Sequence, residues 1–531
     1  MAELGVVAEL GHASRARLTP RLKLALGLSL GLLALRLHTA KGLGFGDAEA
    51  LYACYALYPQ PAYLDHPGLI GVLLRSLGRG GAPHAEIAHG VSALVATLVP
   101  WLGALAVRAT GESWERAAGA VIALALVPEL SVGLFGVSPD LPLAVGWLSA
   151  LALANYLLRP DLPPNHGKRI LLGWLALGFV VGLTILAKLS GALLAVALFV
   201  ATIQSRTRGV WRTFGPWGAV GCAAIVVAPL VGWELANGFP MLEHRLVTTQ
   251  SGAGFSLKNL GKLVGGQLVY VSPPYLLAAW TVGHHLTRHR RRDPASTVLW
   301  WSLVVPLAVL VPLCLWSNRA EPHWIAPPLL ALGVHAARKD LVSRRLVAIA
   351  LGTGAVFTLF VWLSVKTDAV IRLATSKVGQ AFGGYQPRYD LSNDLYAWGP
   401  GKRLLNQAVD DVVAKTGQLP AVVGSPHWMI CAQAQVALGT RVGVGCNSPL
   451  ATDFERWTPS ERWREAPTIL LVHDSRYPID LAADYPSRSM TRSWRTQIRR
   501  ADRVIRTLAI TQLDRSEGVA RAGSTRQPTR R

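Results

Sequence analysis

Charged residues are scarce in this chain of 531 residues: they make up 16% of it, against 51% for hydrophobic residues. A soluble protein of this length carries roughly a quarter charged residues, so the composition argues against an ordinary soluble fold. Acidic residues are scarcer than basic ones: the chain has 31 Asp and Glu against 53 Lys and Arg, which gives a formal charge of +22. Because Lys and Arg cluster in short connections between apolar runs, we attribute this excess to membrane orientation and predict no nucleic-acid partner.

Cysteine is also scarce, with five residues at positions 54, 222, 314, 431 and 446. These residues form no Cys-x-x-Cys pair and no Cys/His spacing typical of a zinc site. Cys431 and Cys446 share one polar region, where they are either a disulfide, if the compartment is oxidising, or two unrelated thiols. The chain also lacks an internal repeat of fixed period, which argues against transporter folds built from duplicated halves.

Long apolar runs fill the first two thirds of the chain, and most approach the ~20 residues that cross a bilayer as a helix. We count eleven, near 21–38, 88–108, 117–136, 141–158, 170–187, 189–204, 214–233, 263–284, 297–316, 323–337 and 346–364. They predict an all-α polytopic membrane domain over residues 1–364 with about eleven transmembrane helices. The first run follows a basic flank, as in a signal peptide, but no small-residue cleavage site follows, so we interpret it as a retained helix.

The connections between these runs alternate in their Lys and Arg content. The rich set lies at 108–116, 159–169, 206–212, 288–292 and 338–345. The positive-inside rule places this set and the N-terminus in the cytoplasm. The set with fewer Lys and Arg residues then faces outward. It includes loop 39–87, loop 234–262 and the tip at 317–323.

The sequence changes character after about residue 365, where no run is long enough to span a membrane. "LPAVVGS" and "PTILLVHD" predict short buried strands, and "GKRLLNQAVDDVVAKTG" and "WMICAQAQVALG" predict amphipathic helices. We therefore predict a small extracytoplasmic α/β domain over 365–515, followed by a disordered tail at 516–531.

Unusual polar residues gather on the outward side. The first outward loop contains "GFGDAEALYACYALYPQPAYLDHPGLIG", and later outward turns add Asp140, Lys188, Glu243, His244, Arg245, Glu321 and His323. Each has an ordinary explanation alone: Asp47 and Asp140 could cap helices, and Lys188 could extend to the headgroups. Together they favour a site where acids supply a base or metal ligand, cations bind a phosphate, and aromatic rings contact a sugar or lipid.

The ordered set of motifs resembles bacterial glycosyltransferase family 39 and its GT-C membrane relatives. These include protein O-mannosyltransferases and the aminoarabinose transferases that act on lipid A. The first loop carries the likeness, followed by "SPDLPLAVGWLSAL", "GLTILAKLSGALL", "NGFPMLEHRL", "GGQLVYVSPPYLL" and "EPHWIAPPLLALG", and by "TDFERW" and "LVHDSRYP" in the tail. The resemblance covers nearly the whole chain. It implies an inverting transfer of a sugar from a polyprenyl-phosphate donor to a hydroxyl of a glycolipid, polysaccharide or protein, at the outer face of a bacterial inner membrane. No nucleotide or redox cofactor is expected.

The resemblance also implies roles for individual residues. Asp47 is the expected base, with Glu49 as the alternative, because this chain has Asp-Ala-Glu where the family usually has adjacent Asp-Glu. In one helix these two residues point ~200° apart, so both face one site only if Asp47 precedes the helix. Asp65 and His244 match a possible divalent-metal site, and His66 and Lys188 match phosphate-contacting positions, to which location adds Arg245. The expected substrate-lining residues are Tyr52, Tyr55, Tyr63, Glu321 and His323.

Two other hypotheses remain open from the sequence. A transporter or flippase for a lipid-linked sugar would show internal repeats and broken helices near mid-membrane, whereas the charged residues of this chain lie at the outer ends of its apolar runs. An inactive relative that only binds a lipid-linked sugar is compatible with the altered acidic motif.

Overall fold

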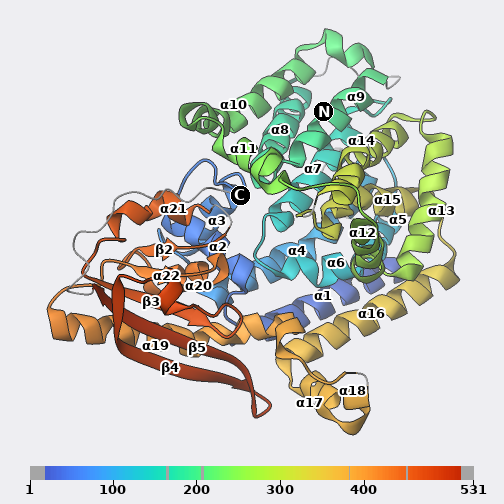
Figure 1. The fold of residues 1–531 in the computed structure, drawn as a ribbon. Coiled ribbons are helices and arrows are strands. Elements are labelled where there is room, and N and C mark those ends of the chain that lie inside the picture. Colours follow the sequence, from blue (N-terminus) through green and yellow to red (C-terminus); the bar gives the residue numbers. More distant parts are fainter. Residues whose placement is uncertain are drawn as a thin grey trace, which may run out of the picture.

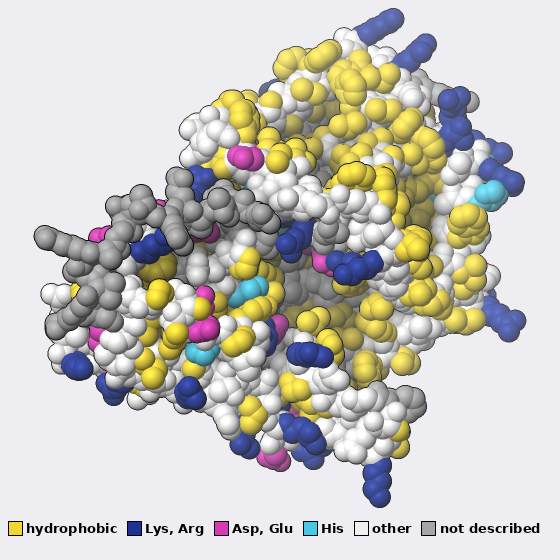
Figure 2. Space-filling view, in the orientation of Figure 1, with side chains coloured by type: hydrophobic (Ala, Val, Ile, Leu, Met, Phe, Trp, Pro, Cys, Tyr) yellow, Lys and Arg dark blue, Asp and Glu magenta, His cyan; other side chains and the backbone are white. Residues whose placement is uncertain are grey.

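The computed structural model describes residues 18–162, 167–204, 208–317, 319–381, 383–449 and 452–515. The predicted basic flank before residue 18 and the predicted tail at 516–531 lie outside these ranges. Figure 1 shows a helical bundle with an α/β domain packed against one end of it. Hydrophobic side chains cover much of the bundle surface in Figure 2, as expected for helices that contact lipid.

All eleven apolar runs form helices, and several begin at side-chain caps: Thr19, Ser113, Ser256, Asp293 and Ser343 each accept a backbone N–H bond of the first turn. The bundle helices are α1 (Pro20–Ala40), α4 (Ala85–Arg108), α5 (Trp114–Leu124), α6 (Pro128–Ser131), α7 (Asp140–Leu157), α8 (Gly167–Ala187), α9 (Gly191–Gln204), α10 (Phe214–Asn237), α12 (Leu257–Tyr270), α13 (Pro273–His289), α14 (Pro294–Trp316), α15 (Ala326–Lys339) and α16 (Arg344–Lys366).

The predicted number of spans is too high. In the described part of the chain, seven helices are long and apolar enough to cross a membrane, or eight if the bent pair Trp114–Leu124 and Pro128–Phe135 is one span. That pair turns by 88° ahead of Pro128, and the run at 263–284 breaks at Ser272, whose φ of 73° precedes two prolines. The helices α9, α12 and α15 have 14 residues each, ~21 Å, which is shorter than the ~30 Å hydrocarbon core.

The C-terminal part forms the predicted α/β domain. Its five-stranded sheet has the order β2-β1-β3-β5-β4, with β1 parallel to β2 and β3, and β5 antiparallel to β3 and β4. The strands are β1 (Val423–Ser425), β2 (Val444–Cys446), β3 (Thr468–Asp474), β4 (Arg488–Arg500) and β5 (Arg503–Arg515), and the helices are α17 (Ala369–Thr375), α18 (Lys377–Ala381), α19 (Asp394–Thr416), α20 (Trp428–Leu438), α21 (Phe454–Trp457) and α22 (Leu481–Asp484). The strands and helices predicted for the four quoted segments are all present.

The first outward loop belongs to the core of this domain as much as to the bundle. Its helices α2 (Asp47–Leu57) and α3 (Leu69–Leu77) pack on each other, and α2 packs on α20. Tyr55 and Cys54 share one buried cluster with Ile430. Gly71 allows the close approach of α3, because a Cβ there would lie 2.9 Å from the Cβ of Tyr55. The domain therefore fixes the geometry of the loop that carries most of the candidate site residues.

A disulfide joins Cys431 in α20 to Cys446 at the end of β2, with Cα atoms 5.9 Å apart and a separation of 15 positions in sequence. Closing a loop of this size stabilises a fold by about 3 kcal/mol through the unfolded chain. We expect the double substitution Cys431→Ser, Cys446→Ser to lower the midpoint of thermal unfolding of the domain in oxidising buffer. Adding reductant should lower the midpoint of the parent protein toward that of the variant and leave the variant unchanged; Cys222→Ser is the control.

Candidate active site

A cluster of polar side chains lies where the first loop meets the bundle. Arg245 in α11 (Pro240–Leu246) donates to the backbone carbonyl of Asp65 from Nε at 2.8 Å and from Nη2 at 2.5 Å. Its Nη2 lies 3.5 Å from Oδ1 of Asp65, and Nε2 of His244 lies 3.7 Å from the same oxygen. Nε2 of His66 lies 3.4 Å from both Arg245 Nη2 and the hydroxyl of Tyr52. The structure thus brings together five of the predicted site residues.

A second group of charges lies beside the first. Lys188, just after α8, donates from Nζ to Oδ1 of Asp140 at 2.7 Å, and Nε2 of His323 lies 3.7 Å from the other oxygen of Asp140. Asp140 is the first residue of α7, and its side chain is 18% exposed. The Lys188 ammonium also lies 5.8 Å from the centre of the Trp324 ring. These residues come from three different turns between helices, which the fold collects at one point.

Electrostatics join the two groups into one site. Burial, and then the positive charges of Arg245 and Lys188, lower the pKa of His66 to about 3, while Asp65 and Asp140 oppose that change. Burial disfavours ionisation of Asp65, but His244 and Arg245 outweigh it and hold the pKa of this carboxyl at about 2. At neutral pH the site therefore holds an ionised Asp65 and an uncharged His66 that can donate or accept a hydrogen bond.

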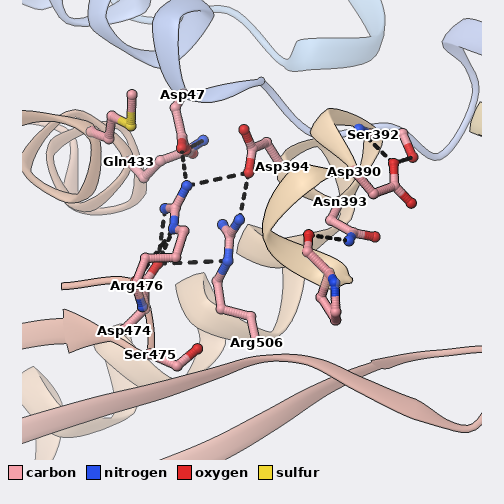
Figure 3. Close-up of polar contacts among 12 residues, drawn as sticks. Asp47, Asp390, Ser392, Asn393, Asp394, Gln433, Asp474, Ser475, Arg476 and Arg506 are labelled. Carbon is pink, nitrogen blue, oxygen red and sulfur yellow. Dashed lines mark hydrogen bonds and ion pairs between the residues drawn. The ribbon is translucent and has the colours of Figure 1, made fainter. Parts of the chain in front are cut away.

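Asp47 lies in a different environment, inside an ionic network with the domain (Figure 3). Its Oδ2 accepts from Nη1 of Arg476 at 2.7 Å, and its Oδ1 accepts from Nε2 of Gln433 at 3.2 Å. Asp474 and Asp394 also pair with Arg476, and Arg506 pairs with both of these carboxylates. The network therefore contains three carboxylates and two guanidinium groups, and Asp47, 5% exposed, connects the first loop to the domain.

Glu49 points away from Asp47, because α2 begins at Asp47 and the two residues occupy one continuous helix. The Glu49 carboxylate accepts from the backbone N–H of Gly46 at 2.6 Å and of Val137 at 2.8 Å, and pairs with Nε2 of His89 at 3.0 Å. Burial alone would raise the pKa of the Glu49 carboxyl. The contacts with His89, Val137 and Gly46 outweigh burial, so the pKa is lowered. Glu49 thus holds the first loop against α4 and the turn before α7.

Three further predicted residues do not line the cluster. The rings of Tyr55 and Tyr63 stack with centroids 3.6 Å apart and are fully buried. The Tyr63 hydroxyl donates to backbone carbonyls of the same loop. Glu321 pairs with Lys262 at 2.8 Å on the exposed rim. Tyr52 and His323, in contrast, contact the site directly.

Sequence analysis counted Asp140 among the outward polar residues but assigned it no role, because Asp after Pro at a helix start also fits a cap. The one signal available was its outward turn within "SPDLPL". The contact of Arg476 with Asp47 joins residues 429 positions apart, and no local pattern predicts it. Asp453, in "TDFERW", makes another long-range contact that the sequence does not predict: both its carboxylate oxygens accept from the backbone N–H of Leu64 at 3.2 Å.

Asp453 makes the contact between domain and first loop pH-dependent. Burial raises the pKa of this carboxyl to about 7, against 3.8 for a free group, and the Leu64 N–H opposes the change. The folded state thus favours the protonated form, so the contribution of this carboxyl to stability is most favourable at low pH and falls as pH rises through about 4 to 7, by up to ~4 kcal/mol. We expect Asp453→Asn to raise the unfolding midpoint at pH 8 more than at pH 5. Equal shifts at both pH values would contradict this assignment; Asp484→Asn, at an exposed position, is the control.

The comparisons with known proteins agree with this architecture. Residues 86–233, which run from α4 to α10 and include Asp140 and Lys188, match the family model of the dolichyl-phosphate-mannose-protein mannosyltransferases. No curated protein sequence matches the chain.

The fold is similar to that of ArnT from Cupriavidus metallidurans. The TM-score is 0.62 against ArnT in the apo state and 0.60 against ArnT bound to undecaprenyl phosphate. Each match has 16% sequence identity and covers 92% of this chain and 97% of that chain. The predicted resemblance and the GT-C fold class are thereby confirmed. A weaker likeness, with a TM-score of 0.48 and 12% identity over 85% of this chain and 69% of that chain, extends to the oligosaccharyltransferase AglB from Archaeoglobus fulgidus and is too distant for comparing sites.

Proposed function

We propose that this chain is an inverting glycosyltransferase that moves a sugar from a polyprenyl-phosphate donor to a hydroxyl acceptor. The observation that supports this most is the joining of Arg245, Lys188 and His66 with two carboxylates in one site at the end of an ArnT-like bundle. In this reaction the acceptor oxygen bonds to the anomeric carbon, the bond from that carbon to the phosphate oxygen breaks, and the acceptor proton goes to a carboxylate.

Cations in the site would bind the donor phosphate. Arg245 offers a fixed guanidinium whose backbone contacts to Asp65 hold it in place, and neutral His66 beside it can donate a further hydrogen bond. Lys188 is the second cation, although its ammonium is engaged by Asp140 and would have to share that contact. Negative charge grows on the phosphate as it leaves, so cations fixed beforehand stabilise the transition state more than the ground state.

The geometry favours Asp140 as the base. Its carboxylate belongs to the same site as His66 and is held by Lys188 and His323. Asp47 and Glu49, the residues that the sequence predicts for this role, have their oxygens bonded to the domain and to α4, respectively. The role of Asp47 or Glu49 as the base remains a prediction, which Asp47→Asn and Glu49→Gln test.

A divalent metal at Asp65 and His244 remains a proposal. The two ligand atoms are 3.7 Å apart, close to the ~3.4 Å that separates neighbouring ligands around a tetrahedral metal with 2.0–2.1 Å bonds. Among the described residues no group of three or more metal-binding side chains occurs. These two residues fit a metal that takes its other ligands from water or from the donor phosphate, where it would supply further positive charge. Arg245 beside Asp65 supplies part of that charge without a metal.

We propose that the site faces the periplasm of a bacterial inner membrane. The Lys- and Arg-rich connections meet at the other end of the bundle, where Arg21 pairs with Asp340 and Arg338 pairs with Asp293. Lys and Arg side chains also appear along the bundle rim farthest from the domain in Figure 2. The positive-inside rule supports a cytoplasmic location for that end.

The test is to incubate the purified protein with a radiolabelled polyprenyl-phosphate sugar and candidate acceptors from membrane, polysaccharide and protein fractions. We expect label to appear in one acceptor fraction with equal release of polyprenyl phosphate. Movement of the intact donor across sealed vesicles without release of polyprenyl phosphate would support the flippase hypothesis instead. Binding of the donor with neither outcome would support the inactive relative.

A further inference from the structure

The short helix α11 carries two residues of the site but has few contacts of its own to hold it in place. Arg245, which contacts Asp65 and His66, lies in its last turn. A helix of seven residues is well below the ~12–15 residues that form a helix alone in water. Of these seven residues, Met241 and His244 are buried. Contacts at the ends of α11 must therefore fix where the Arg245 guanidinium lies.

A side chain from the preceding helix caps the N-terminus of α11. The N-cap residue, Phe239, has no side-chain oxygen for the free N–H groups of the first turn, and Pro240 has no N–H. The Glu234 carboxylate accepts these bonds instead, with Oε1 from the N–H of Met241 and with Oε2 from the N–H of Leu242, each at 3.1 Å. One carboxylate thus satisfies both N–H groups that the first turn leaves open.

The position of Glu234 is unfavourable for its own helix. It lies in the last turn of α10, where the helix dipole disfavours a carboxylate, and it is 4% exposed, so its charge is removed from water. Among the described residues this carboxylate has no cationic partner, and its bonds are the two from α11. The dipole of α11 favours a carboxylate at its N-terminus. An acid at this position therefore serves α11 and not α10.

The chain turns sharply between the two helices, through two left-handed residues. Gly238, with φ of 77°, adopts this conformation easily, but Phe239, with φ of 61°, carries a Cβ that disfavours it. Such a conformation persists only where neighbouring contacts hold it. The backbone carbonyl of Glu234 accepts from the N–H of Phe239 at 2.8 Å, and Met241 shares a buried cluster with Ala62 of the first loop. Glu234 thus holds the corner through its backbone and α11 through its side chain.

The C-terminal domain supports the same corner from outside. In α21, Arg456 donates from Nη2 to Oδ1 of Asn237 at 3.1 Å, and its guanidinium lies 5.0 Å from the centre of the Trp233 ring. Three positions earlier, Asp453 accepts from the N–H of Leu64 in the first loop. One short stretch of the domain therefore contacts both chain segments that carry the phosphate-binding half of the site.

We propose that Glu234 is a positioning residue for the donor phosphate, because it orients α11 so that Arg245 meets Asp65 and His66. The inference rests on the proposed function, since it acts through the arginine that binds the phosphate in that proposal. Glu234 itself bonds to the backbone of α11 and not to the site. A displacement of ~1 Å in a group that binds substrate is enough to cost about 10²-fold in rate, so a cap outside the site can control its activity.

Binding of undecaprenyl phosphate to the full-length protein in lipid nanodiscs tests this role without requiring transfer. Glu234→Ala should weaken binding about tenfold, because a displaced guanidinium loses part of its charged hydrogen bonding to the phosphate. Glu234→Gln keeps the length and one accepting oxygen, so it should lose less. The matched control is Asp293→Ala at the other end of the bundle, where Asp293 accepts from the N–H of Ser296 at 2.8 Å and caps α14. This control should lower the midpoint of thermal unfolding and leave binding unchanged.

A double substitution separates positioning from a general loss of stability. If Glu234 acts through Arg245, Glu234→Ala should change binding by less than about twofold once Arg245→Ala is present. A tenfold loss from Glu234→Ala in both backgrounds would overturn the inference. If Arg245→Ala weakens binding and Glu234→Ala does not, the inference fails while the proposed function stands. If the expected binding losses occur but no acceptor is ever glycosylated, the proposed function fails while the positioning role at the phosphate site stands.

Discussion

Asp140→Asn is expected to reduce the turnover number for sugar transfer by about 10²–10⁴-fold, the usual contribution of a general base. The amide keeps the size of the side chain and a hydrogen-bond acceptor for Lys188, so the fold should be retained. The measurement is single-turnover release of polyprenyl phosphate from labelled donor at saturating acceptor. Donor binding should change by far less than the rate, because in our proposal Asp140 acts on the acceptor.

Asp47→Asn is the decisive comparison for this prediction. Its network contains one more carboxylate than guanidinium, and an amide oxygen can still accept from Arg476, so the substitution improves the charge balance. Burial raises the pKa of Asp394, and the charge of Asp47 raises it further. Removing that charge should therefore make Asp394 easier to ionise. We expect Asp47→Asn and Glu49→Gln each to keep the rate within about tenfold of the parent, a change of ~1.4 kcal/mol. A fall of 10³-fold in Asp47→Asn with normal activity in Asp140→Asn would return the role of base to Asp47.

Arg245→Ala should have the second large effect, a loss of about 10²–10³-fold in kcat/KM, comparable to removing one fixed donor from a developing anion. The guanidinium contacts both Asp65 and His66, and its removal should also let the pKa of His66 rise, because the charge of Arg245 is one cause of the lowered pKa. Donor affinity of the variant should therefore weaken at pH 8. It should recover in part as pH falls through the raised pKa of His66, because the protonated imidazole supplies a positive charge.

Two variants separate this role from a structural one. Arg245→Lys keeps the charge but not the paired backbone contacts to Asp65, and should restore part of the activity. Lys262→Ala removes a cation from the exposed pair with Glu321 and should leave transfer unchanged. Full activity in Arg245→Ala would show that the phosphate binds elsewhere.

Much of the fold was predictable because membrane helices carry their signal locally. Each apolar run is helical, two of them as broken pairs, and the segment "PTILLVHD" forms the central strand β3. The number of spans was not predictable to the same degree, because hydropathy continues through the break at Ser272 and the bend before Pro128. Backbone geometry at these positions, which composition does not record, shortens the helices.

The site was predictable only where residues share an outward turn. The structure brings together five basic residues from the outward turns, as their topology suggested: His66, Lys188, His244, Arg245 and His323. Asp47 and Glu49 diverge because a continuous helix points them in different directions, and because partners nearly 430 and 40 positions away hold them. Long-range pairs such as Asp47 with Arg476 depend on how the domain docks, and no short motif encodes that.

Our central claim is that Arg245 and His66 hold the phosphate of a lipid-linked donor beside Asp140. The most direct test is a cryo-electron microscopy structure of the protein in nanodiscs with undecaprenyl phosphate. The account predicts phosphate density within hydrogen-bond distance of the Arg245 guanidinium and the His66 ring. Phosphate density beside Arg476 and Asp47, or at the Arg21 end of the bundle, would contradict it.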